Sequence, residues 1–274
     1  MSTMKSNSYK EKFGSLSAAR RVWAIASIHG EAAALVTVHD EISRRWEHGD
    51  RLVYLGNYLG RGSDIKAVFD ELLSFRINRL CMPGMIPEDI VFLRGAQEEI
   101  LRSLLQLQLA PQPTDVFNWM IANDIGYTLE AYGESEEETR RYVREGILAT
   151  TKWTNRLREK IREHPGHNDI LIALRRAAFT EGGELLFVHA GIDPDLPVVE
   201  QNDNFWWGHS HFKDINTPYA GFRKVIRGFE RHHGGVTVTP YTITLDGGSG
   251  FGGTLEAACF NLDGKTVDQI SVPT

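Results

Sequence analysis

The segment Ala26-Ser27-Ile28-His29-Gly30 decides the fold, because it lies between an apolar run at residues 22–25 (VWAI) and helical periodicity over residues 31–46. Two further apolar runs, residues 51–55 (RLVYL) and 90–93 (IVFL), are likewise followed by a polar or glycine-containing turn and a helical pattern. This alternation predicts successive βαβ units with parallel strands. Since ligand groups in such sheets lie in the loops at the carboxyl ends of the strands, these turns are the first candidates for a site.

Composition limits the possible class of protein. The 274 residues, 42% of them hydrophobic, fit one large domain, and a net charge of −6 favours neither nucleic acid nor an anionic membrane as a partner. Cys81 and Cys259 form no CxxC pair, so we expect neither a disulfide framework nor structural zinc. With neither a spanning apolar run nor a signal-peptide core in sight, we expect a cytoplasmic protein with a flexible arm at residues 1–20 and a single domain at 21–274.

Three more motifs accompany the first: residues 56–62 (GNYLGRG), 94–98 (RGAQE) and 189–191 (HAG). In order and spacing the four resemble the metallophosphoesterase signatures GD-x-HG, GD-x-x-DRG, RGNHE and HAG. The resemblance is closest to the bacterial serine/threonine phosphatase branch of the calcineurin-like superfamily. Residues 245–255 (LDGGSGFGGTL) also resemble the terminal I-D-T-G-x-x-x-G-G-x-L segment of that family, although a glycine-rich hairpin loop is an alternative.

The resemblance implies an α/β fold: a β-sandwich of two mixed sheets flanked by helices, with a helical cap insertion at about residues 111–178. Trp119-Met120 and the segment 128–133 (TLEAYG) match the insertion of the bacterial branch, which covers the site. The alternating charges of residues 134–144 are typical of a solvated helix face. Further strands are expected at residues 185–188, 224–226, 236–239, 241–245 and finally 255–262.

The family holds two metal ions, which activate a water and stabilise in-line attack on phosphorus. At an effective dielectric of ~20 and a separation of ~4 Å, two divalent ions repel each other by roughly 20 kcal/mol, so anionic ligands are required. Four of the six protein ligand positions lack the family residue: Ser27, Asn57, Ala96 and Phe229. Only His29 and His189 remain. We therefore expect no cofactor, the alternative being a single weakly bound divalent metal such as manganese.

The catalytic positions are altered as well. Gln97 aligns with the catalytic histidine, and Gly60 aligns with the aspartate that supports it. An amide does not titrate in the useful range, so Gln97 cannot serve as a general acid. Arg61 and Arg94 keep the arginines that contact the substrate phosphate in active relatives, and guanidinium groups suit phosphate geometry. They are candidates for anion binding, or else scaffold residues in ion pairs, for instance Arg94 with Glu98 or Glu99.

Other side chains offer further alternatives. His209-Ser210-His211 and His232-His233 are candidates for replacement metal ligands, but such pairs near turns are more often exposed or capping. Phe205-Trp206-Trp207 is a candidate recognition patch, although the family packs an aromatic segment here as core.

The favoured hypothesis is therefore a non-catalytic pseudophosphatase that acts by binding an unknown protein or phosphorylated ligand. The alternative is a divergent phosphoesterase, a phosphoprotein or nucleotide phosphate hydrolase, that works through His29, His189, Arg61 and Arg94 at an altered metal site. A third possibility is a structural subunit contacted through the helical insertion. A resemblance in fold does not decide between them.

Overall fold

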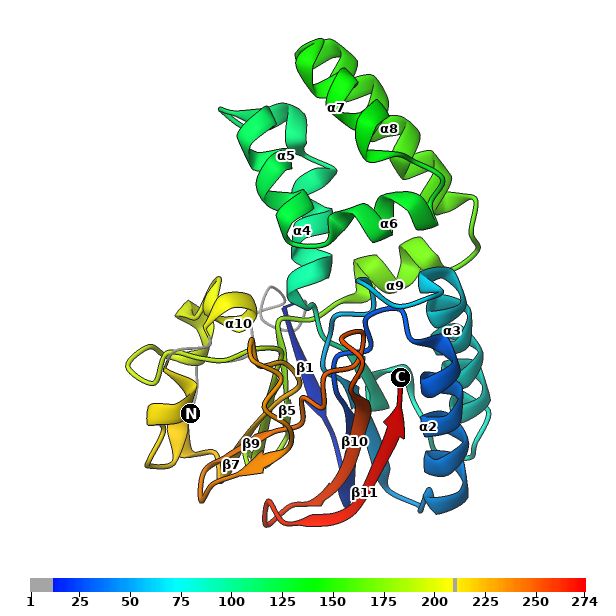
Figure 1. The fold of residues 1–274 in the computed structure, drawn as a ribbon. Helices are drawn as coiled ribbons and strands as arrows, with labels where there is room; N and C mark the ends of the chain where they lie inside the picture. Colours follow the sequence, from blue (N-terminus) through cyan, green and yellow to red (C-terminus); the bar gives the residue numbers. More distant parts are fainter. Residues whose placement is uncertain (1–11, 209–210) are drawn as a thin grey trace.

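The computed structural model describes residues 12–208 and 211–274, and two sheets form the centre of the molecule (Figure 1). The five-stranded sheet has the order β11-β10-β2-β3-β4 and the six-stranded sheet the order β1-β5-β6-β7-β9-β8. Their strands are β1 (Phe13–Leu16), β2 (Arg21–Ile25), β3 (Asp50–Tyr54), β4 (Ile90–Phe92), β5 (Ala177–Thr180), β6 (Leu185–Val188), β7 (Lys224–Arg227), β8 (Thr237–Val238), β9 (Thr242–Thr244), β10 (Thr254–Asn261) and β11 (Thr266–Pro273). Both sheets contain parallel and antiparallel pairs, so the expected mixed β-sandwich is confirmed.

Strand β2 lies inside the five-stranded sheet, parallel to β3 and antiparallel to β10. Val22 and Ala24 belong to the apolar core between the two sheets. Trp23 and Ile25 face the opposite way, into a core that the sheet shares with the neighbouring helices. Because successive side chains of a strand alternate between faces, burial of both faces explains the uninterrupted apolar run.

Helices cover the outer faces of the sandwich. Figure 1 shows α2 and α3 beside the five-stranded sheet, α10 on the other flank, and α5 to α8 projecting from one end. The helices are α2 (Ala32–Arg45), α3 (Ile65–Leu80), α4 (Ala96–Leu104), α5 (Pro113–Ala122), α6 (Ile125–Ala131), α7 (Glu136–Arg144), α8 (Ile147–Arg162), α9 (His167–Ala173) and α10 (Asn204–Trp207). Short 3-10 turns are η1 (Pro87–Asp89), η2 (Leu107–Leu109), η3 (Val198–Glu200), η4 (Phe212–Asp214) and η5 (Tyr219–Gly221).

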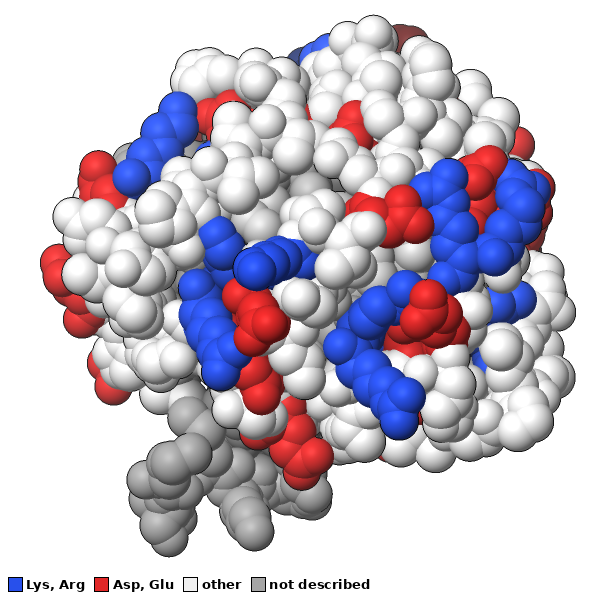
Figure 2. Space-filling model, turned by 90° about the horizontal axis from the view of Figure 1, so that it is seen from below, with Lys and Arg blue, Asp and Glu red and all other residues white. Residues whose placement is uncertain are grey.

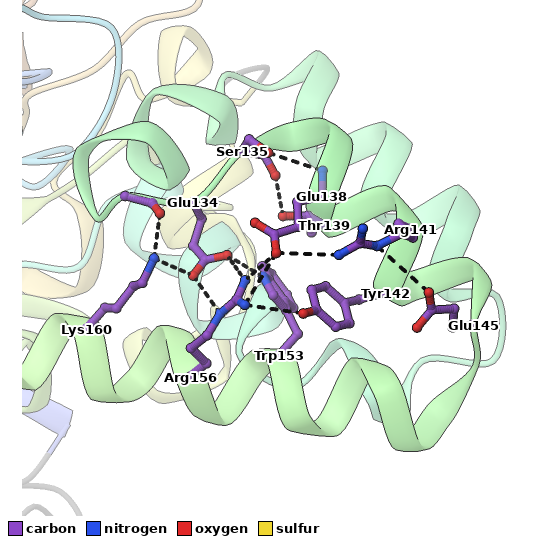
Figure 3. Close-up of polar contacts among 11 residues, drawn as sticks. Glu134, Ser135, Glu138, Thr139, Arg141, Tyr142, Glu145, Trp153, Arg156 and Lys160 are labelled. Atoms are coloured by element: carbon purple, nitrogen blue, oxygen red, sulfur yellow. Dashed lines mark hydrogen bonds and ion pairs between the residues drawn. The ribbon is translucent and has the colours of Figure 1, made fainter.

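The helical insertion is built around a buried carboxylate. Glu134, just before α7, has a fully buried side chain that accepts hydrogen bonds from the Trp153 indole and from Arg156, and forms an ion pair with Lys160 (Figure 3). The prediction of a solvated face for residues 134–144 therefore holds for exposed side chains of α7 such as Arg141 and is wrong for Glu134. Charge alternation along the sequence does not reveal that α8 supplies partners for one of these carboxylates.

Two expectations about the ends of the domain were wrong. The arm predicted at residues 1–20 is too long, because β1 pairs in parallel with β5 and buries Phe13 and Leu16; residues 1–11 lie outside the described part. The strand expected to be last, residues 255–262, is followed by β11, which pairs with it. Half of the residues of strand β11 (TVDQISVP) are polar and most of the strand is exposed, so it lacks the continuous apolar signal of a core strand.

Basic and acidic side chains are mixed on the surface opposite the helical insertion. Figure 2 shows Lys and Arg next to Asp and Glu across this face, with no large area of one sign. In the described residues no helix is long and apolar enough to cross a membrane.

Candidate functional site

The loops that carry the motifs meet at the carboxyl ends of β2, β3, β4 and β6. The backbone N–H groups of Ile28 and His29 both donate to the Asn57 carbonyl, at 3.0 and 2.7 Å. His29 and Asn57 have left-handed φ values of 53° and 55°, a conformation that is uncommon for non-glycine residues but that His and Asn adopt more readily than most. A Cβ on Gly95 would lie 2.2 Å from the Asn57 nitrogen, so the third loop can approach this closely only with glycine. The loops that carry the first three motifs therefore lie against one another.

The buried side chain of Glu98 connects two of these loops by hydrogen bonds. Its carboxylate accepts four backbone N–H groups, from Asn57 (2.9 Å), Tyr58 (2.8 Å), Leu59 (3.1 Å) and Gly95 (2.8 Å). Burial raises the pKa of Glu98, against the opposing effect of these donors. This glutamate thus links the loop after β3 to the start of α4.

Asn57, at the position of a bridging metal ligand in the family, is engaged at both ends of its amide. Its Oδ1 accepts the backbone N–H of Gln97 at 3.0 Å, which fixes the orientation of the amide because an N–H can only donate. Its Nδ2 therefore donates to Nε2 of His29 at 3.2 Å. Burial lowers the pKa of His29 to about 4, so the imidazole is neutral at pH 7 and its Nε2 lone pair is directed at an amide.

Aromatic rings pack on the two retained histidines. Phe229 stacks on His189 with ring centroids 5.3 Å apart and also contacts His29 at 5.9 Å. Phe251 meets the His29 ring edge-on at 5.3 Å and stacks on His233 at 4.0 Å. Apolar rings therefore lie where a charged metal centre would need anionic and polar ligands.

The other altered positions are buried or sterically blocked. Ser27 is buried and its backbone N–H donates to Gly228, while its hydroxyl has no hydrogen-bond partner among the described atoms. A Cβ on Gly60 would lie 2.3 Å from Nδ1 of His29, so an aspartate there would displace the imidazole. Ala96 is the buried first residue of α4 and offers no ligand atom.

His189 has a defined tautomer. Its Nδ1 lies 2.7 Å from the Leu55 carbonyl oxygen, which can only accept, so the proton is on Nδ1 and the lone pair on Nε2. His189 thus retains the protonation state of a metal ligand. His29 does not present its lone pair in the same way, because Asn57 occupies it.

The pair of metal ions that the resemblance implies does not fit these side chains. No carboxylate stands at Ser27 or Asn57, the Asn57 amide directs an N–H group at His29, and Phe229 replaces a nitrogen ligand by a ring. Neutral donors cannot offset the repulsion between two divalent cations. In residues 12–208 and 211–274, no group of three or more His, Cys, Asp or Glu side chains is placed to hold a metal ion.

Both candidate anion-binding arginines form ion pairs within the chain. Arg61 donates from Nε to Asp124 at 2.8 Å and lies over the Phe251 ring, 4.8 Å from its centroid. Arg94 contacts Glu99 at 3.3 Å, one of the two glutamates expected as its partner. Burial lowers the pKa of Arg94, whereas the hydrogen bond to Asp124 raises that of Arg61.

The additional histidines do not assemble into one cluster in the described structure. Nδ1 of His233 lies 2.9 Å from Asp246, His232 is exposed, and His211 lies 4.0 Å from an exposed aspartate. Residues 209–210 of the His209-Ser210-His211 candidate lie outside the described part. Burial opposes ionisation of Asp246, but His233 and two backbone N–H groups hold its pKa below the usual range.

The aromatic segment before that gap is mainly core. Phe205 and Trp206 are buried on the outer face of the six-stranded sheet, as the core interpretation expects. Trp207 is 37% exposed and meets Trp119 of α5 edge-to-face, with centroids 5.8 Å apart. This aromatic pair lies between α10 and the helical insertion.

Sequence reasoning missed the roles of three residues of the site: Asp124, Phe251 and Glu98, which was considered only as a partner of Arg94. Glu98 ends the RGAQE motif, so its position next to the ligand loops was available as a signal. Asp124 and Phe251 had none, because their partners Arg61 and His29 are distant in sequence.

No protein-family model matches this chain, and no curated protein matches its sequence. Solved structures do match. A structure described as a "putative diadenosine tetraphosphatase" has 19% identity and a TM-score of 0.56 over 95% of this chain and 97% of that one. A serine/threonine phosphatase from Saccharomyces cerevisiae has 13% identity and a TM-score of 0.54, covering 96% and 84%. A cold-active protein-tyrosine phosphatase from a Shewanella species has 14% identity and a TM-score of 0.54, covering 97% and 85%. The chain therefore shares its overall fold with these solved phosphatase structures.

Proposed function

We propose that this chain is a phosphoesterase-fold protein that does not hydrolyse phosphoesters and acts by binding. One observation carries the proposal: neutral side chains at the metal positions are locked to one another, with Asn57 bridging Gln97 and His29, and aromatic rings pack on both retained histidines. A two-metal mechanism needs anionic ligands and a water held between two cations. The loop geometry of the fold is kept while this chemistry is missing.

Gln97, which aligns with the catalytic histidine of the family, supports the same conclusion. The Gln97 amide donates from Nε2 to the Asn123 carbonyl at 3.0 Å, at the end of α5. A side-chain amide neither releases nor takes up a proton at neutral pH, so it cannot protonate a leaving group. Gln97 instead joins the site to the helical insertion.

The binding partner is proposed to be a protein. A phosphorylated ligand would meet Arg61 and Arg94 only in competition with Asp124 and Glu99. The helical insertion presents exposed apolar side chains, including Leu148 near the start of α8. We further propose that the protein is cytoplasmic and that it uses no cofactor.

Metal analysis tests the proposal directly. Tag-free protein is incubated with Mn²⁺, desalted and analysed for bound metal, and we expect well under one ion per chain. A combined variant restores the family residues: Ser27→Asp, Asn57→Asp, Ala96→Asn, Gln97→His and Phe229→His. We expect it to retain more Mn²⁺ than the wild type, because two carboxylates and two imidazoles are added.

Two results would contradict the proposal: one or two ions retained by the wild type, or metal-stimulated phosphoester turnover by rigorously purified protein. Circular dichroism of the combined variant separates failure of the alignment from failure of folding. If the folded variant binds Mn²⁺ no better than the wild type, at least one of the assigned ligand positions is wrong.

The second candidate is a divergent phosphoesterase with an altered metal site. The observation in its favour is the His189 tautomer, which keeps the lone pair on Nε2 as a metal ligand requires. Under this hypothesis, alanine at His189 or Arg94 abolishes an activity that persists through purification. An activity that survives both substitutions comes from a contaminant.

A further inference from the structure

The turn between α5 and α6 places the carboxylate of Asp124 against Arg61, the arginine of the DRG-like motif. Asp124 accepts a hydrogen bond from Nε of Arg61 at 2.8 Å. The Arg61 side chain is 42% exposed, and its guanidinium is also held over the Phe251 ring. Arg61 is therefore oriented from two sides, by an anion and by an aromatic ring.

Asp124 is fixed in this position by the backbone around it. It has a left-handed φ of 70°, and its N–H donates to the Ile121 carbonyl at 3.1 Å. The next residue, Ile125, is fully buried in the core beneath the insertion, and the preceding carbonyl, of Asn123, accepts the Gln97 amide. The main chain that carries Asp124 is therefore held in place, and this keeps its carboxylate next to Arg61.

We propose that Asp124 is a built-in anion that occupies Arg61 and prevents phosphate-type dianions from binding there. The pair Arg61–Asp124 has no net charge, whereas Arg61 alone would present a cation already oriented on Phe251. A dianion approaching the pair is repelled by the carboxylate and finds Nε of the guanidinium already engaged. This inference holds whether or not the chain hydrolyses phosphoesters, since it concerns anion access alone.

In this proposal, the helical insertion blocks the binding of anions to Arg61 of its own chain. The Asp124 carboxylate takes the position on Arg61 that an external phosphate group would otherwise occupy. The contacts of the neighbouring residues Asn123 and Ile125 hold the main chain at this point. Removing only the charge of Asp124 should therefore convert Arg61 into an anion site without disturbing the fold. Asparagine suits this purpose because it is isosteric with aspartate and tolerates the left-handed conformation.

Binding of inorganic phosphate, measured by isothermal titration calorimetry at low ionic strength and neutral pH, tests the proposal. We expect Asp124→Asn to bind phosphate at least about tenfold more tightly than the wild type, a change worth about 1.4 kcal/mol. The double variant Asp124→Asn/Arg61→Gln should return to the affinity of the wild type. Asp115→Asn, on exposed α5, removes the same charge away from Arg61 and should leave the affinity unchanged.

Three outcomes would overturn the proposal. Asp124→Asn binds phosphate no more tightly than the wild type, Asp115→Asn gains as much as Asp124→Asn, or the double variant keeps the gain. If Asp124→Asn does not fold, Asp124→Gly provides the same comparison, because glycine adopts positive φ without strain. For either variant the far-ultraviolet circular dichroism spectrum is recorded first.

Discussion

Glu98 beneath the candidate site and Glu134 in the helical insertion are both buried carboxylates, and they are satisfied in different ways. Glu98 accepts four backbone N–H groups from two loops. Glu134 is held by side chains, namely the Trp153 indole, Arg156 and Lys160 (Figure 3). The first arrangement fixes the path of the main chain, and the second fastens two helices to each other. The loops of the site are thus kept in place independently of any metal.

The pKa shifts of the two groups have opposite directions. Burial raises the pKa of Glu98, and the backbone N–H donors offset this effect only in part. Burial acts on Glu134 too, but Arg156, Lys160 and Trp153 outweigh it and hold its pKa below the usual range. The comparison teaches that side-chain cations compensate the buried carboxylate of the insertion, whereas backbone N–H groups compensate the one at the site.

The largest expected effect is that of Glu98→Gln. A glutamine amide offers one acceptor oxygen, so two of the four backbone N–H groups lose their partner and face an N–H₂ group. With a cost of about 2 kcal/mol for each buried unsatisfied donor, the free energy of unfolding should fall by about 4 kcal/mol. Urea denaturation measures this change.

Glu99→Gln is the matched control, because Glu99 is the next residue and forms ion pairs with Arg94 and Arg102 near the surface. Its loss should be only about 1 kcal/mol. If the two variants lose equal stability, the backbone contacts of Glu98 do not have the structural role assigned to them.

The second prediction concerns pH and His29. Its pKa is about 4 in the folded protein against an ordinary value of 6.5, so the unfolded state takes up a proton more readily as the pH falls. The wild type should therefore lose up to about 3 kcal/mol of stability between about pH 7 and about pH 4 through this group alone.

His29→Asn removes the titrating group and retains a residue that tolerates positive φ. Urea unfolding of both proteins at several pH values isolates the contribution, since His39 and His167 titrate in both. A stability difference between them that stays constant over this pH range would mean that His29 is hydrated rather than buried beneath the rings.

The third prediction, with the smallest expected effect apart from the Glu99→Gln control, is that of Glu134→Gln. The glutamine still accepts one hydrogen bond, and Arg156 and Lys160 are partly exposed and can be hydrated. We expect a loss of about 2 kcal/mol at neutral pH. Because the pKa of Glu134 is lowered by folding, this contribution is present above the ordinary glutamate pKa and is lost as the pH falls through the folded value.

Thermal unfolding of the wild type and Glu134→Gln from neutral to acidic pH measures the third prediction. The two melting temperatures should converge as the pH falls. If the two melting temperatures instead move apart at acidic pH, the ion pairs of Glu134 are not the source of its contribution to stability, and the contrast drawn with Glu98 does not hold.

Much of the central fold could be predicted because its signals are local. The strand at residues 185–188 coincides with β6, and the helical periodicity of residues 31–46 brackets α2. The ends of the domain could not be predicted, since β1 is a four-residue strand and β11 is half polar and mostly exposed. Strands of this kind acquire their identity from the pairing with β5 and β10, which no local pattern records.

By itself, the sequence determined the alternation of strands and helices near the start of the domain, the turns in which a site was to be sought, and the missing carboxylates at Ser27 and Asn57. These follow from periodicity and residue chemistry, which are local properties. Only the tertiary structure decided what occupies the site: Phe251 on His29, and Asp124 on Arg61. Each of these contacts joins residues far apart in the chain, and whether two such groups meet depends on how the insertion and the glycine-rich loop pack on the sandwich.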